Sequence, residues 1–195
     1  MIGVDVVITL SPFCMFDICM NLPKYWIFNF NKTIKYDRGE LDVIEPSEYD
    51  AIVTLLWYPL SEVVEIYSRG RNRGIFKSMF KHRKEERREL SNEVVLSIYR
   101  DKVISRLMKE LRGFNLLRME KKYICNHMAY YDEMVFESSS FRLFHRTTVK
   151  ALRVQYLFIC DESKRLFALY LSTLEKSFKK YEKCFEDIVR SFRCH

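Results

Sequence analysis

Two pairs of neighbouring cysteine and histidine residues are the first candidates for chemistry in this sequence. Cys125 and His127 are separated by one residue, and Cys194 and His195 are adjacent. Two thiolates and two imidazoles can form a tetrahedral zinc site if the C-terminal segment returns to the middle of the chain. Adjacent ligands are geometrically awkward, however, and neither the CxxC nor the HxxxH spacing occurs. The sequence therefore favours a protein without a bound metal or cofactor.

The six cysteines have a simpler interpretation as ordinary thiols. No export signal is apparent, so we expect reduced cysteines in a cytoplasmic protein. No apolar run approaches the ~20 residues that a membrane span requires. The expected role of most of these cysteines is that of small buried hydrophobic residues. This interpretation covers Cys14, Cys19, Cys125, Cys160 and Cys184.

Motifs of catalysis are missing from the sequence. There is no GxSxG, P-loop, GxGxxG or HExxH pattern. Paired acids such as Glu85-Glu86 and Asp132-Glu133 have the character of a solvated surface. The sequence thus predicts a protein that is not an enzyme and has no small-molecule substrate.

Positive charge is concentrated between residues 69 and 88. This segment holds nine basic and two acidic residues, so its net charge equals the +7 of the whole chain. Such a patch is typical of proteins that bind phosphate-rich partners, with a solvated helix as the alternative. RNA is favoured over DNA because no pattern places a recognition helix in a major groove. The candidate RNA-binding residues are Arg69, Arg71, Arg73, Lys77, Lys81, Arg83, Lys84, Arg87 and Arg88.

The end of the sequence combines an aromatic ring, a guanidinium and an imidazole. Phe192, Arg193 and His195 could enter an RNA pocket and stack on bases. The alternative is an ordinary frayed terminus, in which the two basic side chains complement the helix dipole. The alternative is the favoured one.

The pattern of apolar residues predicts a single α+β domain over residues 1–195. Short β-branched and aromatic runs in the first third and over 114–160 predict a mixed or antiparallel sheet. Residues 69–90 are expected to form a basic loop-helix arm, within a central helix pair over about 75–112. Residues 162–193 are expected to form one long amphipathic helix. Its apolar seam is Phe167, Leu171, Leu174, Phe178, Tyr181, Phe185, Ile188 and Phe192.

The whole chain is similar to the compact, glycine-poor and aromatic-rich proteins of microsporidian type. In size and charge it resembles a ribosome dormancy (hibernation) factor of this type. The resemblance implies binding to ribosomal RNA and ribosomal proteins, with a tRNA site blocked and translation inhibited.

A second function remains open beside RNA binding. The C-terminal seam could pair with a helix of another protein, and the basic run could bind an acidic partner, as in an adaptor. Phe and Tyr pack poorly into a two-stranded coiled coil, which prefers Ile, Val and Leu. We therefore expect the seam to cover the protein's own sheet and the protein to be monomeric by itself.

Overall fold

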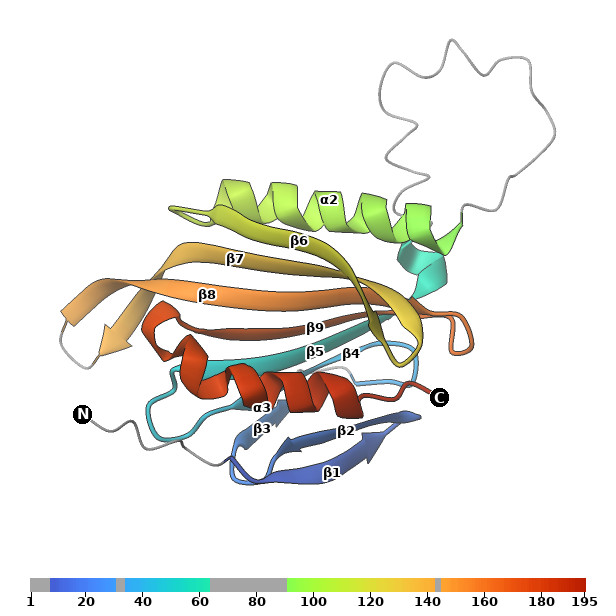
Figure 1. The fold of residues 1–195 in the computed structure, drawn as a ribbon, viewed down its shortest axis with the longest axis horizontal. Helices are drawn as coiled ribbons and strands as arrows, with labels where there is room; N and C mark the ends of the chain where they lie inside the picture. Colours follow the sequence, from blue (N-terminus) through green and yellow to red (C-terminus); the bar gives the residue numbers. More distant parts are fainter. Residues whose placement is uncertain (1–7, 31–33, 64–90, 143–144) are drawn as a thin grey trace, which may run out of the picture.

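Nine β-strands dominate the described part of the protein. The computed structural model describes residues 8–30, 34–63, 91–142 and 145–195. Seven strands form one antiparallel sheet in the order β3-β4-β5-β9-β8-β7-β6, and the other two form a separate hairpin (Figure 1). The strands are β1 (Leu10–Met15), β2 (Ile18–Pro23), β3 (Ile27–Phe30), β4 (Gly39–Ile44), β5 (Ala51–Pro59), β6 (Asn115–Ile124), β7 (His127–Arg142), β8 (His145–Cys160) and β9 (Arg165–Leu174).

The central strands are apolar throughout because both of their faces are covered. In β5, Val53, Leu55 and Trp57 belong to the larger core. Leu56 and Tyr58 alternate with them and pack against a smaller core on the opposite face. Successive side chains of a strand point to opposite faces, so a strand between two cores has no polar side. This explains the continuous apolar run at residues 51–58, which the sequence correctly predicts to be a strand.

Two helices cover opposite faces of the sheet. Helix α2 (Asn92–Glu110) contacts β7 and β8, and its first turn is capped by the hydroxyl of Ser91, which accepts the Val94 N–H at 3.4 Å. Helix α3 (Phe178–Ser191) follows the short 3-10 turn η2 (Glu175–Ser177) and packs between β9 and β2 (Figure 1). None of the helices described is both long and apolar enough to cross a membrane.

The predicted α+β class, with its central helix pair and long C-terminal helix, is wrong. The protein is mostly β, built on the seven-stranded antiparallel sheet. The first half of the predicted C-terminal helix is strand β9, and α3 begins only at Phe178. Both faces of β9 are buried, so its apolar side chains could fall by chance on the helical spacing. Of the predicted central pair, α2 is present, and residues 75–90 lie outside the described residues.

The seam of α3 covers the protein's own structure. Tyr181, Cys184, Phe185, Ile188 and Val189 are its buried residues. The interpretation of these side chains as an intramolecular seam is correct, and they are not available to a partner helix. The adaptor hypothesis therefore loses its proposed binding surface.

A buried ion pair fixes α2 on the sheet. Arg100 donates from Nε and Nη2 to Oδ1 of Asp132, at 2.7 and 2.5 Å, and Gln155 donates to Oδ2 at 3.0 Å. The Asp132 side chain is fully buried, so the prediction of a solvated surface is wrong for this residue. Removing one partner of such a pair leaves an uncompensated charge in the core.

We expect Arg100→Met to lower the free energy of unfolding by about 3–5 kcal/mol, because it strands the Asp132 carboxylate. Urea denaturation measures the loss. Arg106→Met is the matched control: Arg106 lies on the same helix, pairs with Glu110 at 3.3 Å and is exposed, so its replacement costs at most ~1 kcal/mol. Equal losses for the two variants would contradict this account of how α2 is held.

Candidate metal centre

The tight turn between β6 and β7 presents Cys125 and His127. Ile124 and His127 form the last pair of the two strands. Cys125 and Asn126 between them have φ values of 48° and 62°. Two successive positive φ values are the geometry of a type I′ hairpin turn, which favours Asn and Gly. A cysteine tolerates this conformation poorly, and backbone strain of this kind concentrates at functional sites.

The C-terminal segment approaches this turn from the other side. After α3 the chain pairs with β2, where Cys19 and Arg193 exchange both backbone hydrogen bonds, at 2.9 and 2.7 Å. The side chains on either side of Arg193 in sequence are fully buried, at Phe192 and Cys194. This pairing holds the last residues in an extended conformation against the sheet.

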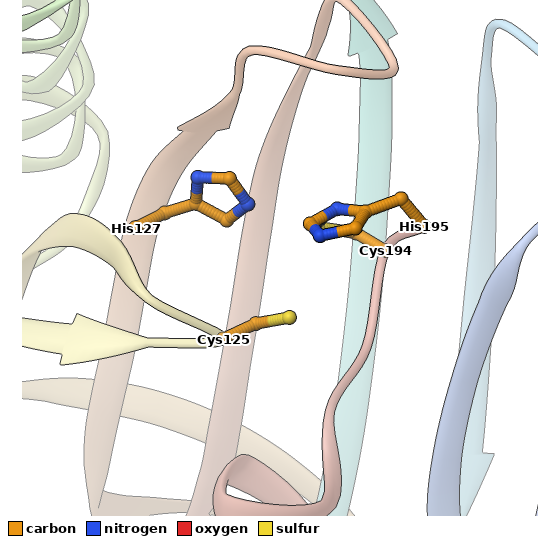
Figure 2. A group of neighbouring side chains, drawn as sticks. All are labelled: Cys125, His127, Cys194 and His195. Atoms are coloured by element: carbon orange, nitrogen blue, oxygen red, sulfur yellow. Dashed lines mark hydrogen bonds between the residues drawn. The ribbon is translucent and has the colours of Figure 1, made fainter.

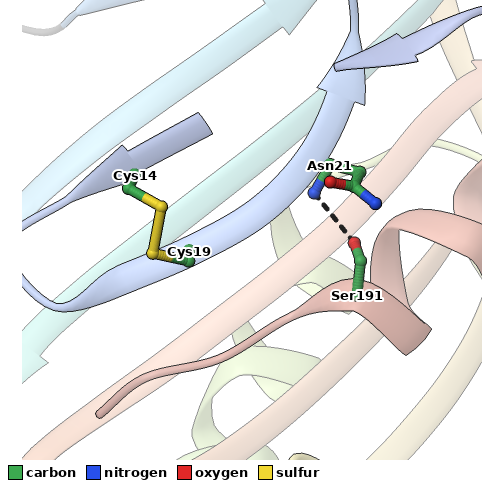
Figure 3. The surroundings of a disulfide bond; sticks show 4 residues. All are labelled: Cys14, Cys19, Asn21 and Ser191. Carbon is green, nitrogen blue, oxygen red and sulfur yellow. Dashed lines mark hydrogen bonds between the residues drawn. A yellow bond between two sulfur atoms is a disulfide. The ribbon is translucent and has the colours of Figure 1, made fainter. Parts of the chain in front are cut away.

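The hairpin that holds the C-terminal segment is itself cross-linked. A disulfide bond joins Cys14 in β1 to Cys19 in β2 (Figure 3). The hydroxyl of Ser191 accepts the Asn21 N–H at 2.8 Å, a second contact between β2 and the end of α3. The prediction that all six cysteines are reduced is therefore wrong for Cys14 and Cys19. The sequence separation permits this bond, but only the hairpin places the two residues opposite each other.

The two Cys/His pairs converge on one point. The potential ligand atoms of Cys125, His127, Cys194 and His195 all lie within 4.8 Å of one another. The side chains of Cys125, His127 and His195 point toward a common centre (Figure 2). Around one tetrahedral zinc ion, ligand atoms lie about 3.3–3.8 Å apart.

His127 has an unsatisfied ring nitrogen in this cluster. Its Nε2 atom is buried and has no hydrogen-bond partner. The ring stacks on Phe158, with a centroid distance of 6.3 Å, and lies perpendicular to the ring of His195 at 5.4 Å. Burial, together with the neighbouring His195, lowers the pKa of His127 below its ordinary value. A neutral imidazole with a free buried nitrogen is the form that binds a metal ion.

His195 is oriented by contacts on both of its ring nitrogens. Nε2 lies 3.3 Å from Oε1 of Glu162. Nδ1 lies 3.5 Å from the sulfur of Cys194 and 3.5 Å from that of Cys160. A carboxylate on one nitrogen fixes the tautomer that leaves the other nitrogen free to coordinate, as in many zinc sites.

The thiols of Cys194 and Cys160 have opposite electrostatic environments. Burial, followed by hydrogen bonds with Cys160 and Cys125, raises the pKa of Cys194 far above its ordinary value. Burial also acts to raise the pKa of Cys160, but hydrogen bonds with Ser163, Cys194 and His195 outweigh it and lower that pKa. A bound cation would reverse the effect at Cys194, because coordination deprotonates a thiol.

The buried guanidinium of Arg165 is hydrogen-bonded to the backbone of the cluster at Cys194. Arg165 is 1% exposed and donates to the carbonyl oxygens of Phe16, Tyr36 and Cys194, at 3.1, 3.0 and 3.4 Å. Its guanidinium lies over the ring of Tyr36 at 4.6 Å. Within the described part of the chain, no carboxylate forms an ion pair with it.

The residues predicted to bind RNA belong to two groups. The basic residues between 69 and 88 lie outside the described residues. In the predicted tail, Phe192 is fully buried and packs edge-on against Phe158 and Phe167, so its ring cannot stack on a base. Arg193 donates to the carbonyl oxygens of Arg190 and Phe192 and so caps α3.

Three residues that contribute to the site could not be identified from the sequence as ligands or as residues that position a ligand. Cys160, Glu162 and Arg165 surround the turn between β8 and β9, and only the return of the C-terminal segment brings them to the cluster. The prediction of buried cysteines is confirmed for Cys160 and Cys184, but Cys14 is exposed and Cys19 and Cys125 are only partly buried. A cysteine at the end of a strand gives no indication of what faces it across the sheet.

Comparison with known proteins identifies the family. A sequence model described as PsbP matches residues 80–194, more than half of the chain. The chain belongs to the PsbP family. No curated protein matches its sequence. Since the PsbP match rests on fold and sequence pattern rather than on bulk charge, the resemblance to ribosome dormancy factors is wrong. The predicted RNA-binding, ribosome-blocking role and the ribosomal partners are wrong with it.

The fold is similar to that of a solved PsbP structure. The solution structure of cyanobacterial PsbP (CyanoP) from Synechocystis sp. PCC 6803 superimposes with a TM-score of 0.56 at 13% identity, covering 100% of this chain and 95% of that one. LpqN of Mycobacterium tuberculosis, involved in cell envelope biogenesis, gives 0.46 at 14% identity, over 95% and 90% of the two chains. The Saccharomyces cerevisiae Ran-binding protein Mog1p gives 0.47 at 6% identity, over 96% of each chain.

The Cys14–Cys19 disulfide bond is expected to stabilise the extended conformation of the C-terminal segment. Replacing Cys14 and Cys19 together by serine should lower the free energy of unfolding by about 2 kcal/mol, the scale for a short closed loop. It should also accelerate amide hydrogen exchange in residues 192–195, because Arg193 N–H is bonded to the Cys19 carbonyl. Mass spectrometry of peptic peptides measures this exchange, and peptides from β7 serve as the unaffected reference. Unchanged exchange at 192–195 would contradict the coupling.

Proposed function

We propose that this PsbP-family protein is a non-catalytic domain that binds one zinc ion through Cys125, His127, Cys194 and His195. The observation that carries the proposal is the convergence of these four side chains from two distant segments. The buried, unpartnered Nε2 atom of His127 supports it independently. A buried polar atom without a partner costs free energy unless a ligand satisfies it.

The ligand types favour zinc over the common hard cations. Thiolate and imidazole are preferred by Zn²⁺, whereas Mg²⁺ and Ca²⁺ prefer oxygen ligands. Two thiolates and two neutral imidazoles also cancel the charge of a divalent ion, so the partly buried centre would carry no net charge. Iron-sulfur chemistry is less suited to this cluster, because such clusters are held mainly by cysteine.

A site with four protein ligands is a structural site. Catalytic zinc ions keep one coordination position open for water or substrate, and structural ones do not. The order Cys160, His195, Glu162 has the chemistry of a nucleophile, a base and an orienting acid. Cys160 is fully buried, however, so its sulfur has no access to a substrate. These points support a protein that is not an enzyme.

The proposed ion would join two parts of the fold that are far apart in sequence. It would tie the β6–β7 turn to the segment that follows α3, and thereby hold α3 on the sheet. The hydrogen bonds between Cys19 and Arg193 hold the same segment from the opposite side.

We also propose that the protein resides in the cytoplasm. The Cys14–Cys19 bond would be exposed to reduction in that compartment, so the zinc ion would be the more durable of the two links.

Zinc stoichiometry tests the proposal directly. Protein purified without chelators is expected to carry about one zinc per chain by inductively coupled plasma mass spectrometry, since the four ligands form one centre. Removing the metal with a chelator should lower the thermal unfolding midpoint, because binding free energy adds to folding free energy.

Variants localise the ion and exclude adventitious binding. The double variant Cys125→Ser/His127→Ala is expected to abolish stoichiometric zinc, because it removes both ligands of the β6–β7 turn. Cys184→Ser is the control, since Cys184 is buried in α3 and is outside the cluster. Wild-type protein that takes up no zinc, or a double variant that still binds one zinc per chain, would refute the proposal.

A further inference from the structure

A fifth possible metal ligand lies beside the four. Cys160 ends β8, is fully buried, and its sulfur lies 3.5 Å from Nδ1 of His195, the same distance as the sulfur of Cys194. The thiol of Cys160 also donates to the backbone carbonyl of Cys194, at 3.9 Å. Cys160 is not one of the four residues whose ligand atoms all lie within 4.8 Å of one another, but it contacts two of them. A third thiol therefore lies at the edge of the centre and makes one group more than a tetrahedral ion can use.

The local structure around Cys160 is suited to a coordinated thiolate. The turn that connects β8 and β9 directs the Ser163 N–H toward its sulfur, at 3.4 Å. An N–H donor stabilises the negative charge that a coordinated sulfur retains. Cys184 provides the contrast: it is also a buried free thiol, but no hydrogen bond to it is found among the described residues. Burial alone does not account for the contacts of Cys160.

His195 is the most accessible member of the four-ligand set. Its residue is exposed, whereas Cys125 and His127 are partly buried and Cys194 is buried. Its other ring nitrogen already has a carboxylate partner in Glu162. Of the four ligands, His195 is therefore the easiest to exchange.

The charge of Arg165 favours a third thiolate. This guanidinium is buried, has no carboxylate partner in the described part of the chain, and contacts the Cys194 carbonyl at 3.4 Å. A divalent ion with two thiolates is neutral and leaves the guanidinium uncompensated. A divalent ion with three thiolates has a charge of −1, which matches the buried positive charge.

We propose that Cys160 is an alternative ligand, which replaces His195 when the bound ion is strongly thiophilic. This inference rests on the proposed zinc site. The centre then becomes Cys125, His127, Cys160 and Cys194. The bond from the metal to His195 Nδ1 breaks and a bond to Cys160 Sγ forms. The thiol proton of Cys160 moves to the released imidazole, which becomes an imidazolium beside Glu162, and no electrons are transferred. Cadmium is the ion of this class chosen as the probe, because softer ions prefer sulfur over nitrogen.

Nuclear magnetic resonance of ¹¹³Cd counts the sulfur ligands. Its chemical shift moves downfield as thiolates replace nitrogen ligands, and a neighbouring residue that is not a ligand does not cause this change. We expect wild-type protein loaded with ¹¹³Cd to give the shift of a three-sulfur site and Cys160→Ser to move it upfield to a two-sulfur value. Cys184→Ser is the matched control and should leave the shift unchanged.

Metal competition provides the second measurement. Cys160→Ser should lower the affinity for cadmium relative to zinc by about tenfold or more, the scale on which close partners of a metal site act. His195→Ala should keep one cadmium per chain, and the double variant Cys160→Ser/His195→Ala should lose it. Amide spectra that superimpose on those of the wild type show that each variant is folded.

The outcomes separate this inference from the zinc site on which it rests. If wild-type protein binds neither zinc nor cadmium, both proposals fall. If zinc binds, but the ¹¹³Cd shift is the same in wild type and Cys160→Ser, the zinc site stands and the role of Cys160 is refuted. Loss of cadmium from His195→Ala while Cys160 is present would also refute it.

Discussion

The hydrogen bonds of the buried Arg165 guanidinium hold together the part of the molecule in which the candidate site lies. One side chain donates to Phe16 in the β1–β2 turn, to Tyr36 before β4, and to Cys194 in the C-terminal segment. A buried positive charge is costly unless polar groups surround it. The three segments must therefore assemble around this residue together, and their assembly brings the C-terminal segment to the β6–β7 turn.

The aromatic core on the same face makes this arrangement specific. Phe158 and Phe167 stack at 5.2 Å on neighbouring strands, and Phe192 packs edge-on against both. The first residue after α3 is thereby anchored against the sheet, and two residues further the chain reaches Cys194, the first of the proposed metal ligands in this segment. Packing, the Cys19–Arg193 pairing and the Arg165 contacts all constrain four consecutive residues. A ligand set assembled from two distant segments requires such constraint, because metal ligands must be held in position before the ion binds.

Several strands could be predicted from sequence because their local signals agree with the fold. The apolar run at 51–58 and the capped helix at 92–110 each follow from short-range patterns. Strand β9 could not be identified in this way, because its residues Phe167, Leu171 and Leu174 fall on the same three- and four-residue spacing as the apolar residues of α3. The basic segment illustrates the limit for function: net charge describes solubility and weak attraction and does not specify a fold. The match of residues 80–194 to the PsbP family overturns the ribosomal interpretation.

The sequence by itself determined the residue types at the candidate site. Cys125, His127, Cys194 and His195 are recognisable as possible zinc ligands, but their spacing argues against a compact local motif. Only the tertiary structure decided that these residues meet, since their contact depends on the antiparallel order of β6 to β9 and on the return of the chain after α3. It also added Cys160, Glu162 and Arg165, whose roles depend entirely on what lies across the sheet. Ligand chemistry is a property of single residues, whereas coordination geometry is a property of the fold.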